Sequence, residues 1–183
     1  MIRPIILYDD PVLREKSSAV DKNSKIDLDK LIDDMFDTMH KAKGIGLSAI
    51  QIGIPLKIFV IEAHIEKENF HFREVFINPR IISYLGENVK HVEGCLSIPY
   101  LTGILERPDG IEIEWYDEKW NYHKEELFGI PSRIIQHEYD HLNGILYIDH
   151  LDIMWKEMFS TPLEMIKDNK IEVNYLCKKA PKE

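Results

Sequence analysis

The sequence has few cysteines, no long apolar run and a shortage of positive charge. Two of its 183 residues are cysteines, Cys95 and Cys177, which is too few for a disulfide framework. No stretch approaches the roughly 20 apolar residues of a membrane span. The apolar run near the N-terminus is also too short for a secretory signal. These absences predict a cytoplasmic protein of a reducing compartment, with no membrane partner.

Basic residues are outnumbered by acidic ones, 23 against 32, which gives a net charge of −9 and a pI near 5.4. Because phosphate contacts need a basic face, such a chain is a poor general binder of nucleic acids. The rest of the composition, 44% hydrophobic and 30% charged, is ordinary for a globular protein. The length suits one domain over residues 1–183.

The apolar pattern predicts three helices. Apolar residues recur at three- and four-residue steps over residues 28–39, with Ser24 as the N-cap and Gly44 as the stop. A second helix is predicted over residues 131–142, with a proline in its first turn and Asn-Gly after it. A third is predicted from Pro162, where Thr-Pro-Leu-Glu has the form of a capping box.

Between the first two helices the sequence is typical of strands. Residues 57–62 and 74–77 are rich in Ile, Phe and Val, and residues 111–116 alternate between apolar and mostly charged side chains. A similar alternation over residues 171–177 predicts a short strand near the C-terminus. The short connections favour antiparallel pairing. Because helices and strands are segregated along the chain, we expect an α+β fold.

The predicted helix over residues 131–142 carries a possible metal site. Residues 137–141 read His-Glu-Tyr-Asp-His. His137 and His141 lie one turn apart on one helix face, so both imidazoles can reach one ion. Glu138 lies beside His137 and can reach a water at the ion without being a ligand. The alternative is two unrelated histidines on an amphipathic helix.

Two histidines do not complete a catalytic site, which needs three protein ligands and one open position. The extended motif that ends in a third histidine is absent, because Tyr147 stands at that position. Downstream candidates are Glu157, Glu164 and His150, and any of them would favour a zinc metallopeptidase. Upstream, Cys95 lies in Glu-Gly-Cys-Leu-Ser, although most free cysteines are simply buried.

Three segments resemble one family when they are taken together. The chain reads Gly-Ile-Gly-Leu-Ser-Ala-Ile-Gln at 44–51, Glu-Gly-Cys-Leu-Ser at 93–97 and His-Glu-Tyr-Asp-His-Leu-Asn-Gly at 137–144. These closely resemble the peptide deformylases, which carry G-x-G-L-A-A-x-Q, E-G-C-L-S and H-E-x-D-H-L-x-G in that order. The departure inside the motifs is Ser48, where the family usually has alanine. The resemblance extends to about His150 and covers residues 151–183 poorly.

The resemblance implies an α+β fold in which antiparallel sheets pack around a central metal-binding helix carrying His-Glu-x-x-His. It implies one catalytic domain over residues 1–183 that removes the formyl group from the N-formylmethionine of newly made polypeptides and releases formate. The substrates would be N-formylmethionyl peptides, including nascent chains at the ribosome. The cofactor would be one divalent metal ion, Fe²⁺ physiologically with Ni²⁺ or Zn²⁺ as substitutes. The alternative function is a zinc metallopeptidase of the HExxH type.

The resemblance also assigns roles to residues by motif position. The metal ligands would be Cys95, His137 and His141. Glu138 would take a proton from water and give it to the leaving amine. The Gln51 side-chain amide and the Leu96 backbone N–H would stabilise the negative charge on the formyl oxygen. We also expect Glu93 and Arg107 to pair and brace the loop of the cysteine.

Four residues are expected to bind the substrate. Gly46, with Ile45 beside it, would let an extended peptide backbone approach closely, because glycine has no side chain. Ile130 and Ile134 would line an apolar pocket for the methionine side chain, since Ile134 shares a helix face with His137. Their alternative role is plain core packing.

Overall fold

The computed structural model describes residues 1–65 and 70–179. The α+β class is confirmed, with one five-stranded antiparallel sheet in the order β2-β3-β4-β5-β6. Its strands are β2 (Gly46–Ser48), β3 (Ile58–Ile65), β4 (Phe70–Cys95), β5 (Ile98–Tyr116) and β6 (Tyr122–Phe128). A separate pair, β1 (Ile5–Ile6) and β7 (Cys177–Lys178), is parallel. Nearly the whole chain connects these two strands, so no short turn dictates their direction.

The helices are α1 (Leu28–Lys41), α2 (Gly129–His141) and α3 (Ile153–Lys167). Short 3₁₀ helices span Pro11–Arg14, Ala49–Ile52 and Tyr147–His150. No helix within residues 1–65 and 70–179 is long and apolar enough to cross a membrane.

Two predicted helix starts are wrong. The first helix begins after Asp27 and not after Ser24, because the Asp27 carboxylate accepts the Lys30 N–H and caps the helix. The third helix begins after Asp152, whose carboxylate caps the Trp155 N–H in the same way. Pro162 therefore lies inside α3.

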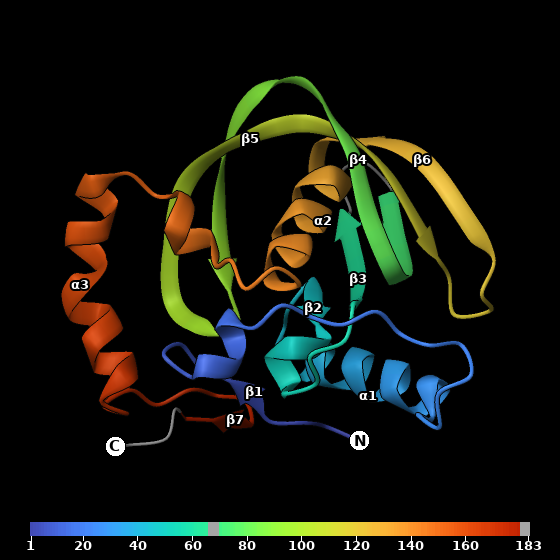
Figure 1. Ribbon diagram of the computed structural model, residues 1–183. Coiled ribbons are helices and arrows are strands. Elements are labelled where there is room, and N and C mark those ends of the chain that lie inside the picture. Colours follow the sequence, from blue (N-terminus) through green and yellow to red (C-terminus); the bar gives the residue numbers. More distant parts are fainter. Residues whose placement is uncertain (66–69, 180–183) are drawn as a thin grey trace.

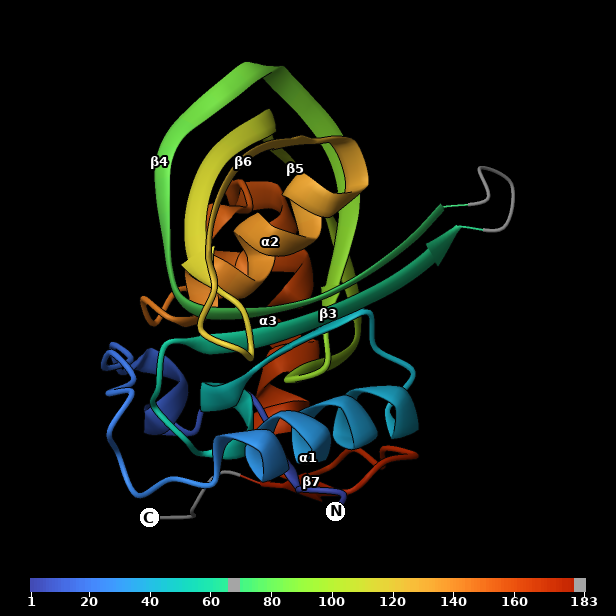
Figure 2. The ribbon, with the colours of Figure 1, turned by 90° about the vertical axis from the view of Figure 1, so that its right-hand side faces the viewer.

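Strand β3 lies between α1 and α2. Successive strand side chains point to opposite faces. Val60 accordingly packs in a cluster with Met35 of α1, whereas Phe59 and Ile61 pack in a cluster with Ile135 of α2. Figure 2 shows α1 and α2 on opposite sides of β3. The sheet thus separates α2 from α1 and packs against both helices.

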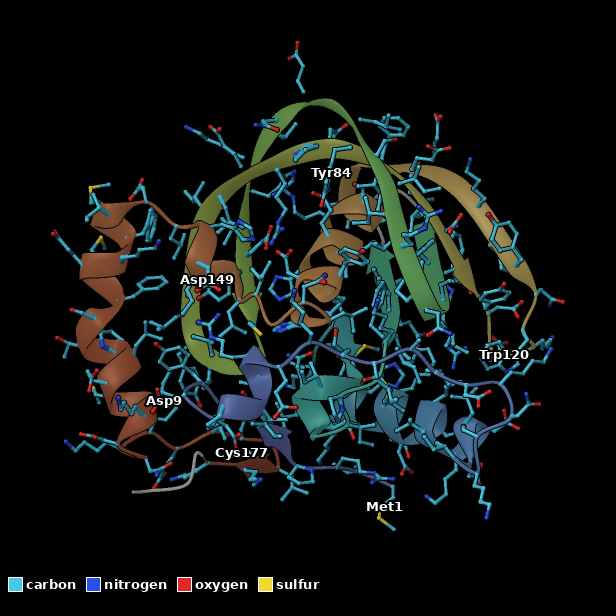
Figure 3. The ribbon with its side chains drawn as sticks, in the orientation of Figure 1. Met1, Asp9, Tyr84, Trp120, Asp149 and Cys177 are labelled. Carbon is cyan, nitrogen blue, oxygen red and sulfur yellow. The ribbon has the colours of Figure 1, made fainter. Side chains whose placement is uncertain are left out.

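Strands β4 and β5 form a long arch over α2 (Figure 1). They span 26 and 19 residues, and their pairing shifts register between Ile77 and Arg80 and between Leu85 and Asn88. Bulges of this kind bend a strand and increase its twist. Tyr84 lies in the upper part of the arch (Figure 3). The arch brings the far end of β4, where Cys95 lies, back towards α2.

The C-terminal segment returns to the start of the chain after α3. Its strand β7 lies beside β1, with Cys177 labelled in Figure 3. The strand predicted over residues 171–177 is thus realised only at Cys177–Lys178. Of the segment 151–183, residues 180–183 lie outside the described part of the chain.

Candidate active site

The structure brings Cys95, His137 and His141 together. Cys95 ends β4, and the two histidines lie one turn apart on α2. Their ligand atoms, one sulfur and two ring nitrogens, all lie within 4.8 Å of one another. The Cys95 Sγ is 3.3 Å from the His141 Nε2. The two elements therefore present three metal-ligating groups at one point.

The other candidate ligands lie elsewhere. The His150 Nε2 is 2.8 Å from the Asp140 Oδ2. Glu157 and Glu164 are exposed on α3. Cys95, His137 and His141 are the one cluster of potential metal ligands within the described ranges. The downstream residues that would favour a metallopeptidase thus do not join the histidines.

The chemistry of this cluster fits a divalent metal ion. The His137 Nδ1 is 2.9 Å from the Glu93 Oε2, which leaves the Nε2 of the same ring free to bind an ion. The His141 Nδ1 is buried and has no hydrogen-bond partner among the described residues, while its Nε2 faces the cysteine sulfur. A thiolate with two imidazoles is a donor set that suits iron, nickel and zinc.

Glu93 is the centre of a buried ion network behind His137. Its carboxylate accepts from the Arg107 Nε at 2.8 Å and Nη2 at 3.1 Å, so the predicted pair is confirmed. Arg133 Nη1 donates to the same carboxylate at 3.1 Å. Burial alone would raise the pKa of Glu93, but hydrogen bonds from His137 and Arg107 outweigh it and lower the pKa to about 2. Glu93 therefore stays ionised and orients the His137 ring.

Glu138 is buried between α2 and β2. Its Oε2 accepts from the Ser48 hydroxyl at 2.7 Å. Its Oε1 lies so close to β2 that a Cβ on Gly46 would come within 2.5 Å of it. Burial raises the pKa of the Glu138 carboxyl, which favours proton uptake. The absence of a side chain at Gly46 thus makes room for a carboxylate.

The Gln51 amide has a fixed orientation at the cluster. Its Oε1 accepts the Ser48 N–H at 2.8 Å, which directs the amide nitrogen to the other side. The Nε2 lies 3.4 Å from the Cys95 Sγ and 3.2 Å from the Ser97 Oγ. Leu96 follows the cysteine in the turn from β4 to β5, and its carbonyl accepts from the Tyr175 hydroxyl at 2.5 Å.

A cavity of about 520 Å³ opens in front of these groups. The four expected substrate-binding residues all line it: Ile45, Gly46, Ile130 and Ile134. Ile45 is 53% exposed at the rim, whereas Ile134 is 6% exposed and also packs in the core cluster of α2. Both roles considered for Ile134, cavity lining and core packing, are thus combined.

Comparison with known proteins identifies the family. The sequence matches the polypeptide deformylase family over residues 2–157. The peptide deformylase of Christiangramia forsetii is 43% identical over 187 aligned residues, which cover 96% of this chain and 94% of that protein. The peptide deformylase of Karelsulcia muelleri is 48% identical over 157 residues, 84% of this chain and 80% of that protein. The chain belongs to the polypeptide deformylase family.

Solved structures of deformylases share this fold. A plant peptide deformylase superposes with a TM-score of 0.83 at 34% identity, covering 92% of this chain and 90% of that one. The peptide deformylase from Plasmodium falciparum superposes with a TM-score of 0.81 at 41% identity, covering 91% of this chain and 96% of that one. This chain is accordingly a metal-dependent hydrolase that removes the N-formyl group from newly made polypeptides.

Three residues that lie near the cluster were assigned no role from the sequence. Arg133 lies one helical turn before His137, so its spacing on α2 was a usable signal. Asp140, within the motif itself, accepts from the Arg107 Nη1 at 2.7 Å. Tyr175 had no such signal, because its partner Leu96 lies 79 residues away in the chain.

Proposed function

We propose that Cys95, His137 and His141 hold the divalent metal of this deformylase, and that the native ion is Fe²⁺. The observation that carries this assignment is the convergence of their three ligand atoms within 4.8 Å at the wall of the cavity. Nickel and zinc are chemically acceptable substitutes for this donor set. A bound divalent ion lowers the pKa of water towards neutrality and so provides a nucleophile.

Glu138 is the proton carrier in this proposal. It accepts the proton of the attacking water and then donates a proton to the leaving amine nitrogen. Three observations support this role: the carboxylate is buried, it adjoins His137 in sequence, and it is not one of the three clustered ligands. Its bond to the Ser48 hydroxyl fixes its position while leaving Oε1 facing Gly46.

Two donors stabilise the negative charge that develops on the formyl oxygen. They are the Gln51 Nε2 and the Leu96 backbone N–H. The Gln51 amide is held by the Ser48 N–H before substrate arrives, so little reorganisation is needed during reaction. Leu96 follows Cys95 in the chain, and the Gln51 Nε2 lies 3.4 Å from the Cys95 Sγ, so both donors belong to the same end of the cavity.

The peptide binds along β2 in an extended form. Because β2 is the first strand in the sheet order, its outer edge is available for pairing with a substrate backbone. Ile45 and Gly46 lie at the start of this edge, and the bare Cα of Gly46 permits close approach. Ile130 and Ile134 line the apolar pocket for the methionine side chain.

Residues 1–183 act as one catalytic domain in the cytoplasm, on nascent chains emerging from the ribosome. The contact of Tyr175 with Leu96 supports the inclusion of the C-terminal segment in this domain. The net charge of −9 argues against direct binding to nucleic acid.

The decisive experiment is formate release from a formyl-Met-Ala-Ser peptide by protein purified anaerobically with iron. We expect release of formate in proportion to bound iron, and a sulfur ligand in the X-ray absorption spectrum of the metal. Cleavage of internal peptide bonds without formate release would favour the metallopeptidase. A metal coordination shell without sulfur would show that Cys95 is not a ligand.

A further inference from the structure

The C-terminal segment touches the catalytic turn through one side chain. Tyr175 lies beyond residue 157, where the family match ends, and it lines the same cavity as Cys95. Its hydroxyl donates to the Leu96 carbonyl oxygen at 2.5 Å. The segment between α3 and β7 therefore reaches the residue that follows the metal-ligating cysteine.

Tyr175 is held in place by backbone pairing close to it. The Ile5 N–H donates to the Leu176 carbonyl and the Leu7 N–H donates to the Lys178 carbonyl, both at 3.0 Å. The tyrosine ring also packs against the buried cluster around β5 and α3. Its position is thus set by the β1–β7 pair and by apolar packing, independently of the Leu96 contact.

A second tyrosine joins the same two segments in the opposite direction. Tyr100 of β5 donates its hydroxyl to the Glu172 carbonyl at 2.8 Å. Each segment therefore accepts a phenol hydrogen bond from the other. Burial raises the pKa of Tyr175, so its hydroxyl keeps its proton through the neutral range and remains a donor.

The turn between β4 and β5 is held at consecutive carbonyls. The Leu96 carbonyl is bound by Tyr175, and the Ser97 carbonyl accepts the Tyr8 N–H at 2.7 Å. Peptide units are planar, so a chain in this turn moves only by rotation at its Cα atoms. Fixing the peptide after Leu96 restricts rotation at the Leu96 Cα. It therefore limits the directions in which the Leu96 N–H can point.

We propose that Tyr175 is a positioning residue that keeps the Leu96 N–H aimed at the formyl oxygen by holding the Leu96 carbonyl. This inference rests on the proposed function, in which the Leu96 N–H stabilises the charged oxygen. Tyr175 acts through the backbone of Leu96 and not on the reacting atoms. The C-terminal segment thereby contributes to the chemical step.

The test is Tyr175→Phe, which removes the hydroxyl and keeps the ring that packs in the cluster. Loss of a donor that stabilises the charged oxygen typically lowers kcat by about 10²–10³-fold. Tyr175→Phe loosens the Leu96 N–H but does not remove it, so we expect kcat to fall about 10-fold. KM should stay within about twofold, because the effect is confined to the transition state. The Leu96 amide should exchange its hydrogen faster, by NMR, in the protein loaded with diamagnetic Zn²⁺ and without substrate.

Tyr122→Phe is the matched control. It also removes a phenol hydrogen bond, to the Glu114 Oε2 at 2.9 Å, on the edge strand β6. It should leave kcat, metal content and the Leu96 exchange rate unchanged. Metal content of Tyr175→Phe should match that of the wild type, and its Tm should fall by no more than about 4 °C, the size expected for loss of one hydrogen bond.

Wild-type kcat together with an unchanged Leu96 exchange rate would overturn the proposal. So would a loss of metal in parallel with kcat, because Tyr175 would then support Cys95. A general rise in exchange across the protein would indicate a merely structural role and overturn it as well. Absence of formate release by the wild type would count against the proposed function, whereas the exchange rate would still report on the contact between the tyrosine and Leu96.

Discussion

The Ser48 hydroxyl lies 2.7 Å from the Glu138 Oε2 and 2.9 Å from the carbonyl oxygen of the same residue. Ser48 ends β2 and Glu138 lies in α2, so one side chain joins the edge strand of the sheet to the helix that carries His137 and His141. A serine hydroxyl carries one hydrogen, which these two acceptors share. The carboxyl group is therefore positioned by a neutral hydroxyl group.

Glu138→Gln should separate chemistry from metal binding. The substitution keeps the shape of the side chain but removes the proton acceptor. We expect kcat/KM for a formyl-Met peptide to fall by about 10⁴-fold, the upper end of general acid–base effects, because one residue serves two proton transfers. Metal content and thermal stability should remain close to wild type. Near-normal turnover with full metal would place the base elsewhere.

Ser48→Ala is the milder companion variant. It introduces the residue that deformylases usually have at this position, and it leaves the Glu138 carboxylate in place. We expect a fall in kcat of less than about 10-fold, since a positioning hydrogen bond is lost but the base remains. Kinetics should be compared at equal metal content. A loss as large as that of Glu138→Gln would mean that the hydroxyl itself takes part in the reaction.

Cys95→Ala should lose most of the bound metal, because only two imidazoles then remain. Cys177→Ala is the matched control, since Cys177 lies in β7 and is absent from the ligand cluster. Elemental analysis after anaerobic purification measures the metal content of both variants. Iron-loaded wild type should also lose activity in air through oxidation of the ion and of the thiolate. Full occupancy in Cys95→Ala would show that another residue is the third ligand.

The sequence predicts the histidine side of the site well because its geometry is local. His137, Glu138 and His141 lie within about one turn of one helix, so their relative positions follow from helical spacing alone. Cys95 could not be placed by such reasoning, since its distance from α2 depends on the curvature of β4 and β5. Its assignment as a ligand comes from the order of three motifs and stays a prediction, and the structure places its sulfur beside the two imidazoles.

The C-terminal segment, residues 151–183, was harder to predict. A capping box before Pro162 and an acidic cap at Asp152 are both ordinary helix starts, and in the structure the helix begins at the Asp152 cap. The alternation over residues 171–177 predicted a strand, but the structure has one only from Cys177 onwards. Its partner β1 and its contact with Leu96 are non-local, and no pattern within the segment specifies them.

The fourth prediction is that protonation of Asp117 in acid lowers the free energy of unfolding. It lies in the turn between β5 and β6, which carries Trp120 (Figure 3). Burial opposes its charge, but hydrogen bonds from Asn121 and His123 outweigh this and lower its pKa from 3.8 to about 2. A lowered carboxyl pKa gives stability that is present above the unfolded value and is lost as pH falls through the folded one.

Asp117→Asn should therefore lower the free energy of unfolding by about 1 kcal/mol near neutrality. The difference from wild type should shrink as the pH falls from about 4 to about 2, since the wild-type carboxylate is then protonated. Urea unfolding curves at several pH values measure it. A difference that stays constant over this interval would contradict the role assigned to the carboxylate.

The last prediction concerns the acyl group. A formyl carbon bears a hydrogen where an acetyl carbon bears a methyl group. In the proposed function the formyl group lies between the Gln51 amide, Leu96 and Glu138, all of which line the cavity. An acetyl methyl would collide there, because Gln51 is held by Ser48 and cannot retreat without losing that bond. We expect kcat/KM for the acetylated peptide to be lower by at least about 100-fold. Comparable values for the two blocking groups would contradict a tight acyl site.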